Sequence, residues 1–433
     1  MSSDSPSKAG RSHPWWKRIA AFIRHIGGDP TLDAVALSEQ DAAARPYVLL
    51  VDSKFPGFVH QVQAFFDNGF LDRSSAVVVC KRYPRAWQEV ARAARTTGIP
   101  LFFFDSVKEL SWITRKTILY PFNAQLNAWM TRQRDSVHVF LSHGESNKVS
   151  SVNPMCRIYD AILTSGDIGA DRYREFLDLP RDLASTRLVC IGRSLIDASS
   201  VAALAAPRPV DATPAIVYMP TWEGGDAQSD YSSVDEAHTA EILGQLCTRL
   251  AAKAVVVKAH PNLGRRCPGY RNALHGIVTH LQARGLEVRH LVEAPAAGSI
   301  LHGLRIVHGV VDVSAAEAML AALGIESLVL VKQGLEIFAP QSYLDLRRHA
   351  LIRCDAAEWQ QQLKLAVGLD QGDGRFTAYC AKLIRSDISP ATTLAIGDVM
   401  PTIVTCLSRR QPLIIGTTPG HDGSAQVNVP SAS

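Results

Sequence analysis

Residues 47–80 read YVLLVDSKFPGFVHQVQAFFDNGFLDRSSAVVVC, and this stretch contains two short apolar runs with the composition of β-strands, Tyr47–Val51 and Ala76–Cys80. Between them lies a helix-like segment, Phe58–Asn68, which ends at Gly69. A strand, a helix and a second strand in this order are typical of a parallel sheet that helices cover on both faces. The stretch therefore predicts an α/β fold.

The same alternation continues along the chain and predicts a first doubly wound domain over residues 46–200. Residues 198–214 are rich in Ala, Pro and Ser and have no strand pattern, so we interpret them as an interdomain linker. The further candidate strands of the first domain are Leu101–Phe104, Val137–Leu141, Ala161–Thr164 and Leu188–Ile191.

A second series of apolar runs predicts a similar domain over residues 215–370. Two helix-like segments, Arg375–Ile384 and Ile396–Leu407, follow it within residues 371–416, and residues 417–433 have the composition of a flexible tail. The candidate strands of the second domain are Ala215–Met219, Ala254–Lys258, Arg305–His308, Leu328–Val331 and Leu351–Arg353. We expect two Rossmann-like domains that face a cleft, where the carboxyl ends of both sets of strands meet and where ligands of open α/β sheets bind.

The overall composition excludes several classes of protein. The 433 residues are 47% hydrophobic, and 45 basic against 41 acidic residues give a net charge of +4, too even a balance to indicate a nucleic-acid partner. The eight cysteines are scattered without a CxxC pair, which favours reduced thiols over a disulfide framework or a metal site. No apolar run reaches the roughly 18–20 residues that span a bilayer, so we expect a cytoplasmic protein.

The N-terminal extension, residues 1–45, contains an amphipathic segment over residues 13–26. Its sequence, HPWWKRIAAFIRHI, separates Trp, Ile and Phe side chains from Lys and Arg side chains around a helix. Such a helix fits the inner membrane surface as a peripheral contact, and it fits equally well against the neighbouring domain. The sequence leaves both interpretations open.

Two histidines occupy the same predicted position, one in each domain. His143 follows the strand of VHVFLSHGESNK, with Gly144 beside it and Lys148 five residues on. His260 follows the strand of VVVKAHPNLGRR, near Lys258. A histidine at the carboxyl end of a parallel strand lies at the cleft and can move a proton near neutral pH, although a strand-end histidine alone is more often structural.

Two further segments follow strands of the second domain. In DVSAAE, Ser314 precedes a helical run and predicts a phosphate contact, a role compatible with a capping box formed with Glu317. In YMPTWE, a strand ends at a proline, and Thr221, Trp222 and Glu223 can line the cleft, although Trp222 also fits a core position.

Taken in order over roughly residues 137–335, these segments resemble the CDP-glycerol glycerophosphotransferase family of teichoic-acid primases and polymerases, which have the GT-B architecture. The family's HGTPLKK-like segment corresponds to HGESNK at 143–148, its APTWR segment to MPTWE at 219–223, and its HP pair to 260–261. Its GxPRxD loop is echoed by Gly192 and Asp197, and its DYSS segment becomes DVSA at 312–315. Met319 stands where the family has a second aspartate, so the donor can differ from CDP-glycerol.

The resemblance implies a transferase for cell-surface polymers that takes a glycerophosphate or related polyol phosphate from a cytidine-nucleotide donor, without a metal or another cofactor. The acceptor is a hydroxyl of a glycan or lipid-linked molecule. His143 and His260 are then catalytic, and the implied substrate-binding residues are Lys148, Thr221, Trp222, Glu223, Lys258, Asp312, Ser314 and Glu317. Transferases that use CMP-sialic acid or CMP-Kdo for capsule or lipopolysaccharide resemble the chain too, and a non-catalytic nucleotide-binding protein of the same fold is a third alternative.

Overall fold

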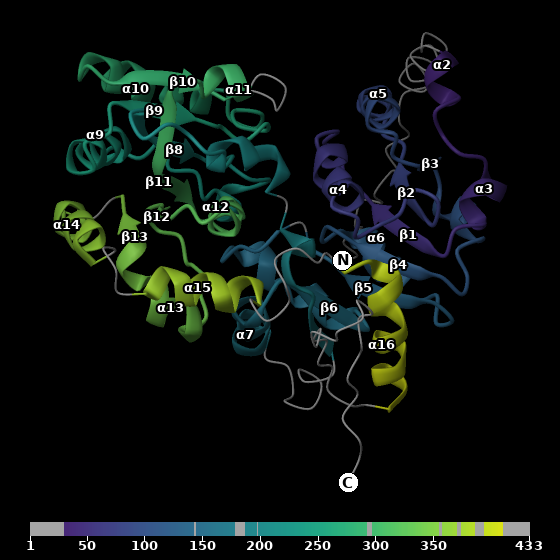
Figure 1. Ribbon diagram of the computed structural model, residues 1–433. Coiled ribbons are helices and arrows are strands. Elements are labelled where there is room, and N and C mark those ends of the chain that lie inside the picture. Colours follow the sequence, from purple (N-terminus) through teal and green to yellow (C-terminus); the bar gives the residue numbers. More distant parts are fainter. Residues whose placement is uncertain are drawn as a thin grey trace, which may run out of the picture.

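The computed structural model describes residues 30–142, 144–177, 187–196, 198–291, 297–354, 357–369, 374–385 and 394–409. These residues form two α/β lobes that lie side by side (Figure 1). The amphipathic segment 13–26, His143, Asp197 and the tail 417–433 all lie outside the described residues.

The N-terminal domain is built on a seven-stranded parallel sheet with the order β3-β2-β1-β4-β5-β6-β7. Its helices lie on both faces of the sheet, and two apolar cores fill the space between sheet and helices. The strands are β1 (Tyr47–Val51), β2 (Ala76–Lys81), β3 (Leu101–Phe104), β4 (Thr117–Tyr120), β5 (Val137–Phe140), β6 (Ala161–Thr164) and β7 (Leu188–Cys190). The helices are α2 (Pro30–Asp33), α3 (Glu39–Ala43), α4 (Phe58–Asp67), α5 (Trp87–Thr97), α6 (Gln125–Met130) and α7 (Asp167–Phe176), with short 3-10 turns at Val107–Leu110, Val149–Val152, Pro154–Ile158 and Gly192–Leu195.

The C-terminal domain is built on a six-stranded parallel sheet with the order β10-β9-β8-β11-β12-β13. Two apolar cores again lie on its two faces. The strands are β8 (Thr213–Met219), β9 (Ala254–Val257), β10 (Glu287–His290), β11 (Leu304–Asp312), β12 (Ser327–Val331) and β13 (Leu351–Arg353). The helices are α9 (Thr239–Arg249), α10 (Gly269–Ala283), α11 (Ala297–Ile300), α12 (Ala316–Ala322), α13 (Gln341–Arg347) and α14 (Trp359–Leu369), with 3-10 turns at Ala227–Ser229 and Arg348–Ala350.

In both sheets all strands are parallel, but the order in which the chain adds them switches from one side to the other. This reversal point lies between β1 and β4 in the first sheet and between β8 and β11 in the second. This is the doubly wound strand order, in which a crevice opens outside the carboxyl ends of the two strands at the reversal. The segments after β8 and β11, which begin at Pro220 and Val313, therefore border such a crevice.

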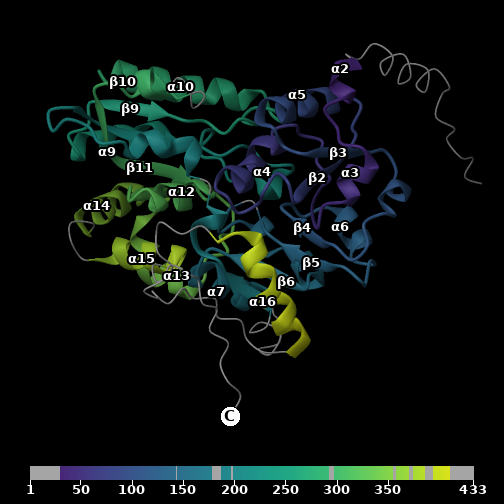
Figure 2. The ribbon, with the colours of Figure 1, turned by 45° about the vertical axis from the view of Figure 1, so that its right-hand side comes forward.

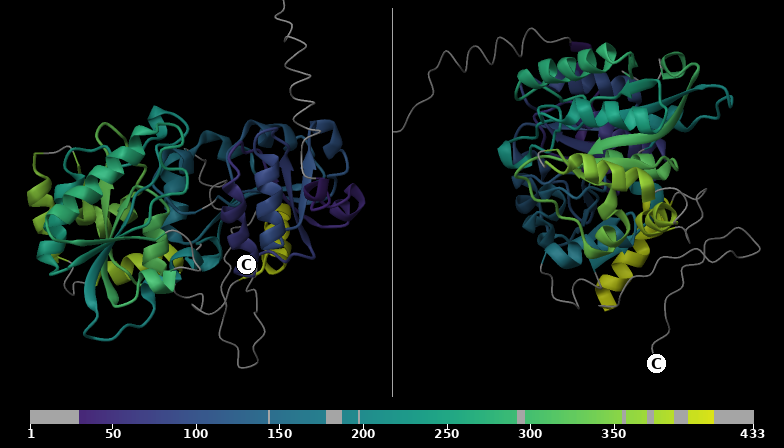
Figure 3. Two further views of the ribbon diagram at one scale, coloured as in Figure 1. Left: turned by 90° about the horizontal axis from the view of Figure 1, so that it is seen from above. Right: turned by 90° about the vertical axis from the view of Figure 1, so that its left-hand side faces the viewer.

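The last two helices both contact the N-terminal domain. Helix α15 (Arg375–Ile384) lies against α13 and α12, where Tyr343 and Tyr379 pack edge to face at a centroid distance of 5.8 Å, and it also lies against α7 of the N-terminal domain. Helix α16 (Ile396–Arg409) returns to the N-terminal domain and places Ile396, Val399 and Ile403 in its core (Figure 2). The view from above shows α16, in yellow, within the lobe of the N-terminal strands (Figure 3).

The segments before and between the domains are also packed. Leu32 and Ala42 of the N-terminal extension are buried against the first sheet, and Leu37 N–H donates to the carbonyl of Leu101 at 2.7 Å. The predicted linker contains a 3-10 helix, Ser199–Ala205, which buries Val201 and Leu204 against the second sheet.

The two-domain α/β prediction is confirmed, and every predicted strand is present, with ends that differ by zero to four residues. Two strands were missed. Strand β4 is only four residues long and follows Arg115 and Lys116 directly, and β10 is an edge strand with the polar sequence EVRH. A search of the described helices for one that is long and apolar enough to cross a bilayer finds none.

Candidate active site

A cavity of about 560 Å³ lies between the two domains, and both contribute side chains to it. Its N-terminal wall includes Ser53, Phe55, His60, Gln61, Phe122, Asn123, Ser142, Gly144 and Lys148. Its C-terminal wall includes Thr221, Trp222, Lys258, His260, Asn262, Ser314 and Ala315. The residues come from the carboxyl ends of strands in both sheets, including the two reversal points, where a ligand is expected.

His260 lies in the loop after β9, and the hydrogen bonding of its ring defines its tautomer. The backbone N–H of Asn262 donates to Nδ1 of His260 at 3.1 Å, which requires a lone pair on that nitrogen. The neutral ring therefore carries its proton on Nε2, where it can donate to a ligand. The ring also stacks on Trp222, with centroids 6.0 Å apart and planes 18° apart.

Glu223 holds the loop that carries His260. Its carboxylate is fully buried and accepts the backbone N–H groups of Gly264, Arg266 and Cys267 at 2.7–2.9 Å. Burial acts to raise the pKa of Glu223, but these N–H groups outweigh burial and leave the pKa below its ordinary value. The predicted substrate contact is therefore corrected: Glu223 is absent from the cavity wall, and its carboxylate positions the loop.

Lys148 reaches from the N-terminal domain into the C-terminal domain. Its Nζ donates to Oγ1 of Thr221 at 3.0 Å and lies 5.5 Å from the ring centre of Tyr231. Burial lowers the pKa of Lys148 to about 8, although the negative charges of Asp312 and Asp230 oppose this shift. Lys148 and Thr221 both line the cavity, as the sequence predicted.

Asp312 lies beneath the cavity and not on its wall. It is fully buried, and its Oδ2 accepts the backbone N–H of Thr221 at 2.6 Å. Burial raises the pKa of Asp312 to about 7, against the lowering by the Thr221 N–H and by Lys148. We therefore correct its predicted substrate contact to a support for the loop after β8.

The loop after β5 belongs to the N-terminal domain and contacts the C-terminal domain. Its Ser142 has a φ of 59°, in the left-handed region, and Ser142 and Gly144 on either side of His143 line the cavity. Backbone strain of this kind costs about 1–3 kcal/mol and is common at functional sites. The loop is held from below by Glu145, whose carboxylate pairs with Arg172 at 2.8 Å and accepts the N–H of Ser165 at 2.7 Å.

Ser314 and Glu317, predicted to act together, lie in different surroundings. Oγ of Ser314 accepts the N–H of Ala316 at 3.3 Å, and Ser314 lines the cavity. The buried carboxylate of Glu317 pairs with Arg347 at 3.2 Å and accepts the hydroxyl of Tyr343, away from the cavity. The capping box is therefore wrong, and the predicted substrate contact of Glu317 is corrected to an ion pair inside the C-terminal domain.

Sequence reasoning missed one side of the cavity. Phe55, His60 and Gln61 follow β1, and Asn123 follows β4, without any motif to mark them. The ring of Phe55 meets Trp222 edge to face at 5.6 Å, and the guanidinium of Arg265 lies 5.4 Å from the centre of the same ring. The one sequence feature that could have indicated these residues is their position after β1 and β4, the strands at the reversal point. Because β4 was not predicted, this feature could not be used for Asn123.

Comparisons with known proteins find similar structures. No protein-family model matches the chain, and no curated protein does. Among solved structures, a UDP complex of MnaA from S. aureus is 12% identical, with a TM-score of 0.49 over 84% of this chain and 96% of that one. An O-GlcNAc transferase variant from Thermobaculum terrenum is 13% identical, with a TM-score of 0.43 over 87% of this chain and 69% of that one.

A third structure is a variant of the wall teichoic acid polymerase TagF soaked with CDPG. It is 10% identical to this chain, with a TM-score of 0.40 over 91% of this chain and 98% of that one. At these identities and scores the likeness carries no argument about activity. The strand order of the two sheets and the cavity between them define the chain as a two-domain protein of the GT-B type.

Proposed function

We propose that the chain is a transferase that moves a glycerophosphate, or a related polyol phosphate, from a CDP-activated donor to a hydroxyl of a glycan or lipid-linked acceptor. One observation carries this proposal. The C-terminal wall of the cavity brings together Lys258, His260 and Ser314, at the carboxyl ends of β9 and β11. An ammonium group, an imidazole N–H and a hydroxyl are donors that suit the oxygens of a pyrophosphate.

The donor pyrophosphate is assigned to this wall, and the acceptor is assigned to the wall formed by the N-terminal domain. In the reaction, the acceptor oxygen attacks the phosphorus of the polyol phosphate, the bond from that phosphorus to the CMP oxygen breaks, and CMP leaves. His143 is the proposed base that takes the acceptor proton. The N–H at Nε2 of His260 and the charge of Lys258 oppose the negative charge that develops on the departing CMP.

Lys148 and Thr221 belong to the same proposed site. Lys148 contacts Thr221 across the cavity and brings a positive charge to the side where donor and acceptor meet. Its lowered pKa, about 8, indicates that the charged form is costly in this surrounding and gains from a bound anion. We therefore expect nucleotide binding to strengthen as Lys148 becomes protonated.

Thermal denaturation with CMP, CDP, CDP-glycerol, CMP-sugars, UDP and GDP tests the proposal. A ligand that binds only the folded chain raises the apparent stability by about 2.7 kcal/mol at a hundred times its Kd. We expect cytidine nucleotides to stabilise the wild type and not the variant His260→Ala. The control is His275→Ala, which removes an exposed histidine of α10 outside the cavity. Stabilisation by UDP or GDP alone would overturn the cytidine assignment.

The transferred group is tested by the mass of the product. Incubation with CDP-glycerol and a glycan acceptor is expected to add glycerophosphate and release CMP. Transfer of a sugar from a CMP-sugar would replace the proposal with a glycosyltransferase that uses the same cleft. Binding of cytidine nucleotides without turnover of any donor would indicate a binding protein.

A further inference from the structure

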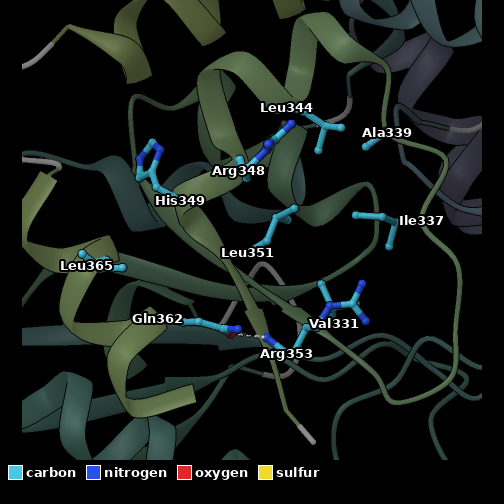
Figure 4. Close-up of a pocket in the computed structure, with 10 residues that line it drawn as sticks. All are labelled: Val331, Ile337, Ala339, Leu344, Arg348, His349, Leu351, Arg353, Gln362 and Leu365. Carbon is cyan, nitrogen blue, oxygen red and sulfur yellow. Dashed lines mark hydrogen bonds between the residues drawn. The ribbon is translucent and has the colours of Figure 1, made fainter. Parts of the chain in front are cut away.

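The C-terminal domain contains a second cavity, of about 550 Å³, which shares no lining residue with the cavity between the domains. It lies beside the edge strand β13, between α13 and the turn after it on one side and α14 on the other (Figure 4). Ligand cavities in proteins are typically about 300–1,000 Å³, so the size suits a small molecule.

The floor of this cavity is aliphatic. Leu344 of α13, Leu351 of β13 and Leu365 of α14 line it together with Ile337. Leu365 is 54% exposed, which makes it one of the more exposed large apolar side chains of the described residues. The aliphatic lining can bury the apolar part of a ligand.

The cavity is not a site for the addition of a strand. The N–H of Arg353, on the edge of β13, donates to Oε1 of Gln362 at 2.9 Å. The side chain of α14 thereby blocks the edge of the sheet, which a pairing strand would need. A molecule in this cavity must therefore bind to the side chains that line it and not to the backbone of β13.

Two of the four polar side chains at the rim are cationic. Arg348, His349 and Arg353 line the cavity, and none of the lining residues is acidic. Among the described residues, neither Arg348 nor Arg353 forms an ion pair, whereas the adjacent Arg347 is buried and pairs with Glu317. Figure 4 shows Leu351 of β13 between Arg348, in the turn before the strand, and Arg353, at the end of the strand.

We propose that this cavity binds an aliphatic chain that ends in an anion, a phosphate or a carboxylate. The leucine side chains bury the chain, and one of the two cationic groups at the rim, Arg348 or Arg353, binds the anionic end through charge-assisted hydrogen bonds. Nucleotides and sugars do not suit the site, because its floor offers them few hydrogen-bond partners.

The segment that lines this cavity also contacts residues beside Lys148. Ile337 and Ala339 line the second cavity, and the main-chain groups of the residues next to them form hydrogen bonds with Tyr231, whose ring lies near Lys148, and with Asn147, which precedes Lys148. The carbonyl of Glu336 accepts the hydroxyl of Tyr231 at 3.0 Å, and the N–H of Phe338 donates to the carbonyl of Asn147 at 2.8 Å. A ligand in the second cavity therefore packs against the segment that contacts the loop of Lys148.

Calorimetric titration of the full chain with dodecyl phosphate, below its micelle concentration, tests the site. We expect 1:1 binding that weakens roughly tenfold or more in Arg348→Gln/Arg353→Gln, since each lost contact involves a charged group. Leu344→Trp, which fills the floor, is expected to abolish binding. The control is Arg249→Gln/Arg305→Gln, which removes the same charge from exposed positions outside the cavity.

Three further titrations complete the test. Dodecanoate is expected to bind at the same site, and dodecyl maltoside and inorganic phosphate are expected to bind at least tenfold more weakly. Equal binding of dodecyl phosphate to the wild type and both pocket variants, or no binding at all, would overturn the proposal. The cytidine-induced thermal shift must persist in Arg348→Gln/Arg353→Gln, so a failure here stays separate from a failure of the proposed activity.

Discussion

Lys148, Thr221 and Asp312 form a chain of contacts from one domain to the other. Lys148 donates to the Thr221 hydroxyl, and the Thr221 N–H donates to Asp312. Burial raises the pKa of Asp312 and lowers the pKa of Lys148, so each residue is costly in its charged form. An anion bound next to Lys148 favours the charged form of Lys148. The protonation of Lys148 therefore depends on whether the cavity holds an anion.

The first prediction concerns the pH dependence of Asp312→Asn. The pKa of Asp312 rises from 3.8 to about 7 on folding, so the folded state holds more protons than the unfolded state in this window. The contribution of Asp312 to stability is therefore present at low pH and is lost as the pH rises from about 4 to about 7. Asn lacks this loss, and we expect the variant to gain stability relative to the wild type over the same range.

Thermal midpoints measured at intervals between pH 4 and pH 7 test this prediction. Lys148, with a pKa of about 8, stays protonated in both states below pH 7 and adds no slope there. A difference between variant and wild type that stays constant over this range would contradict the raised pKa.

The loop after β5 shows how one element depends on another. Glu145 and Arg172, a residue of α7, have side chains that are 7% and 3% exposed. Arg172 also donates to Oδ1 of Asn147 at 3.0 Å. Gly169 of the same helix leaves room for Glu145, because an added Cβ would lie 2.6 Å from its Oε1. Helix α7 therefore holds the loop that carries Lys148.

The second prediction is a double-mutant cycle on this ion pair. Arg172→Met leaves the Glu145 carboxylate buried without its partner, which typically costs about 3–5 kcal/mol. Glu145→Gln in the same chain removes that charge, so the double variant is expected to lose less stability than the sum of the two single losses, by about 1 kcal/mol or more. Urea denaturation measures the three variants, and strictly additive losses would show that the pair is not coupled.

The third prediction concerns α16, which follows the C-terminal domain in the chain but packs on the N-terminal domain. Ile403 is fully buried in the N-terminal core, and its truncation in Ile403→Ala is expected to cost about 2–5 kcal/mol. Val404 is 44% exposed on the same helix, so Val404→Ala is the matched control, with a change within about 0.5 kcal/mol. Calorimetry is expected to show a lower midpoint for one transition only, that of the N-terminal domain.

At the scale of the whole molecule, one close contact between the domains requires a residue without a side chain. Gly144 has a φ of 131°, and a Cβ on it would lie 2.6 Å from the Cβ of Ala315 at the start of α12. The glycine after His143 therefore permits the close approach of the C-terminal domain, in addition to its unusual backbone conformation.

The fourth prediction is that Gly144→Ala separates the domains. The clash and the backbone strain together are expected to cost about 1–3 kcal/mol. We expect a larger radius of gyration in X-ray scattering and a smaller cytidine-induced thermal shift. Gly269→Ala, where an added Cβ meets nothing within 4 Å, is the control. Identical scattering of the two variants would contradict this role of Gly144.

The sequence by itself determined the two parallel sheets, most of their strands and several residues of the cleft, because these depend on local patterns. An apolar run followed by a polar residue marks the end of a buried parallel strand, which is how Lys148, Thr221, Trp222, Lys258, His260 and Ser314 were found. The same reasoning could not detect β10, whose polar residues at the sheet edge lack that pattern.

The tertiary structure alone decided what the buried carboxylates do. Three carboxylates lie at the end of a strand or the start of a helix, where ligand-binding residues are common: Glu223, Asp312 and Glu317. Each of them is buried and binds a residue that is distant in the sequence. Tertiary packing also decided the domain on which α16 lies and which residues after β1 and β4 complete the cleft. These outcomes depend on contacts between segments distant in sequence, and periodicity within one segment contains no information about them.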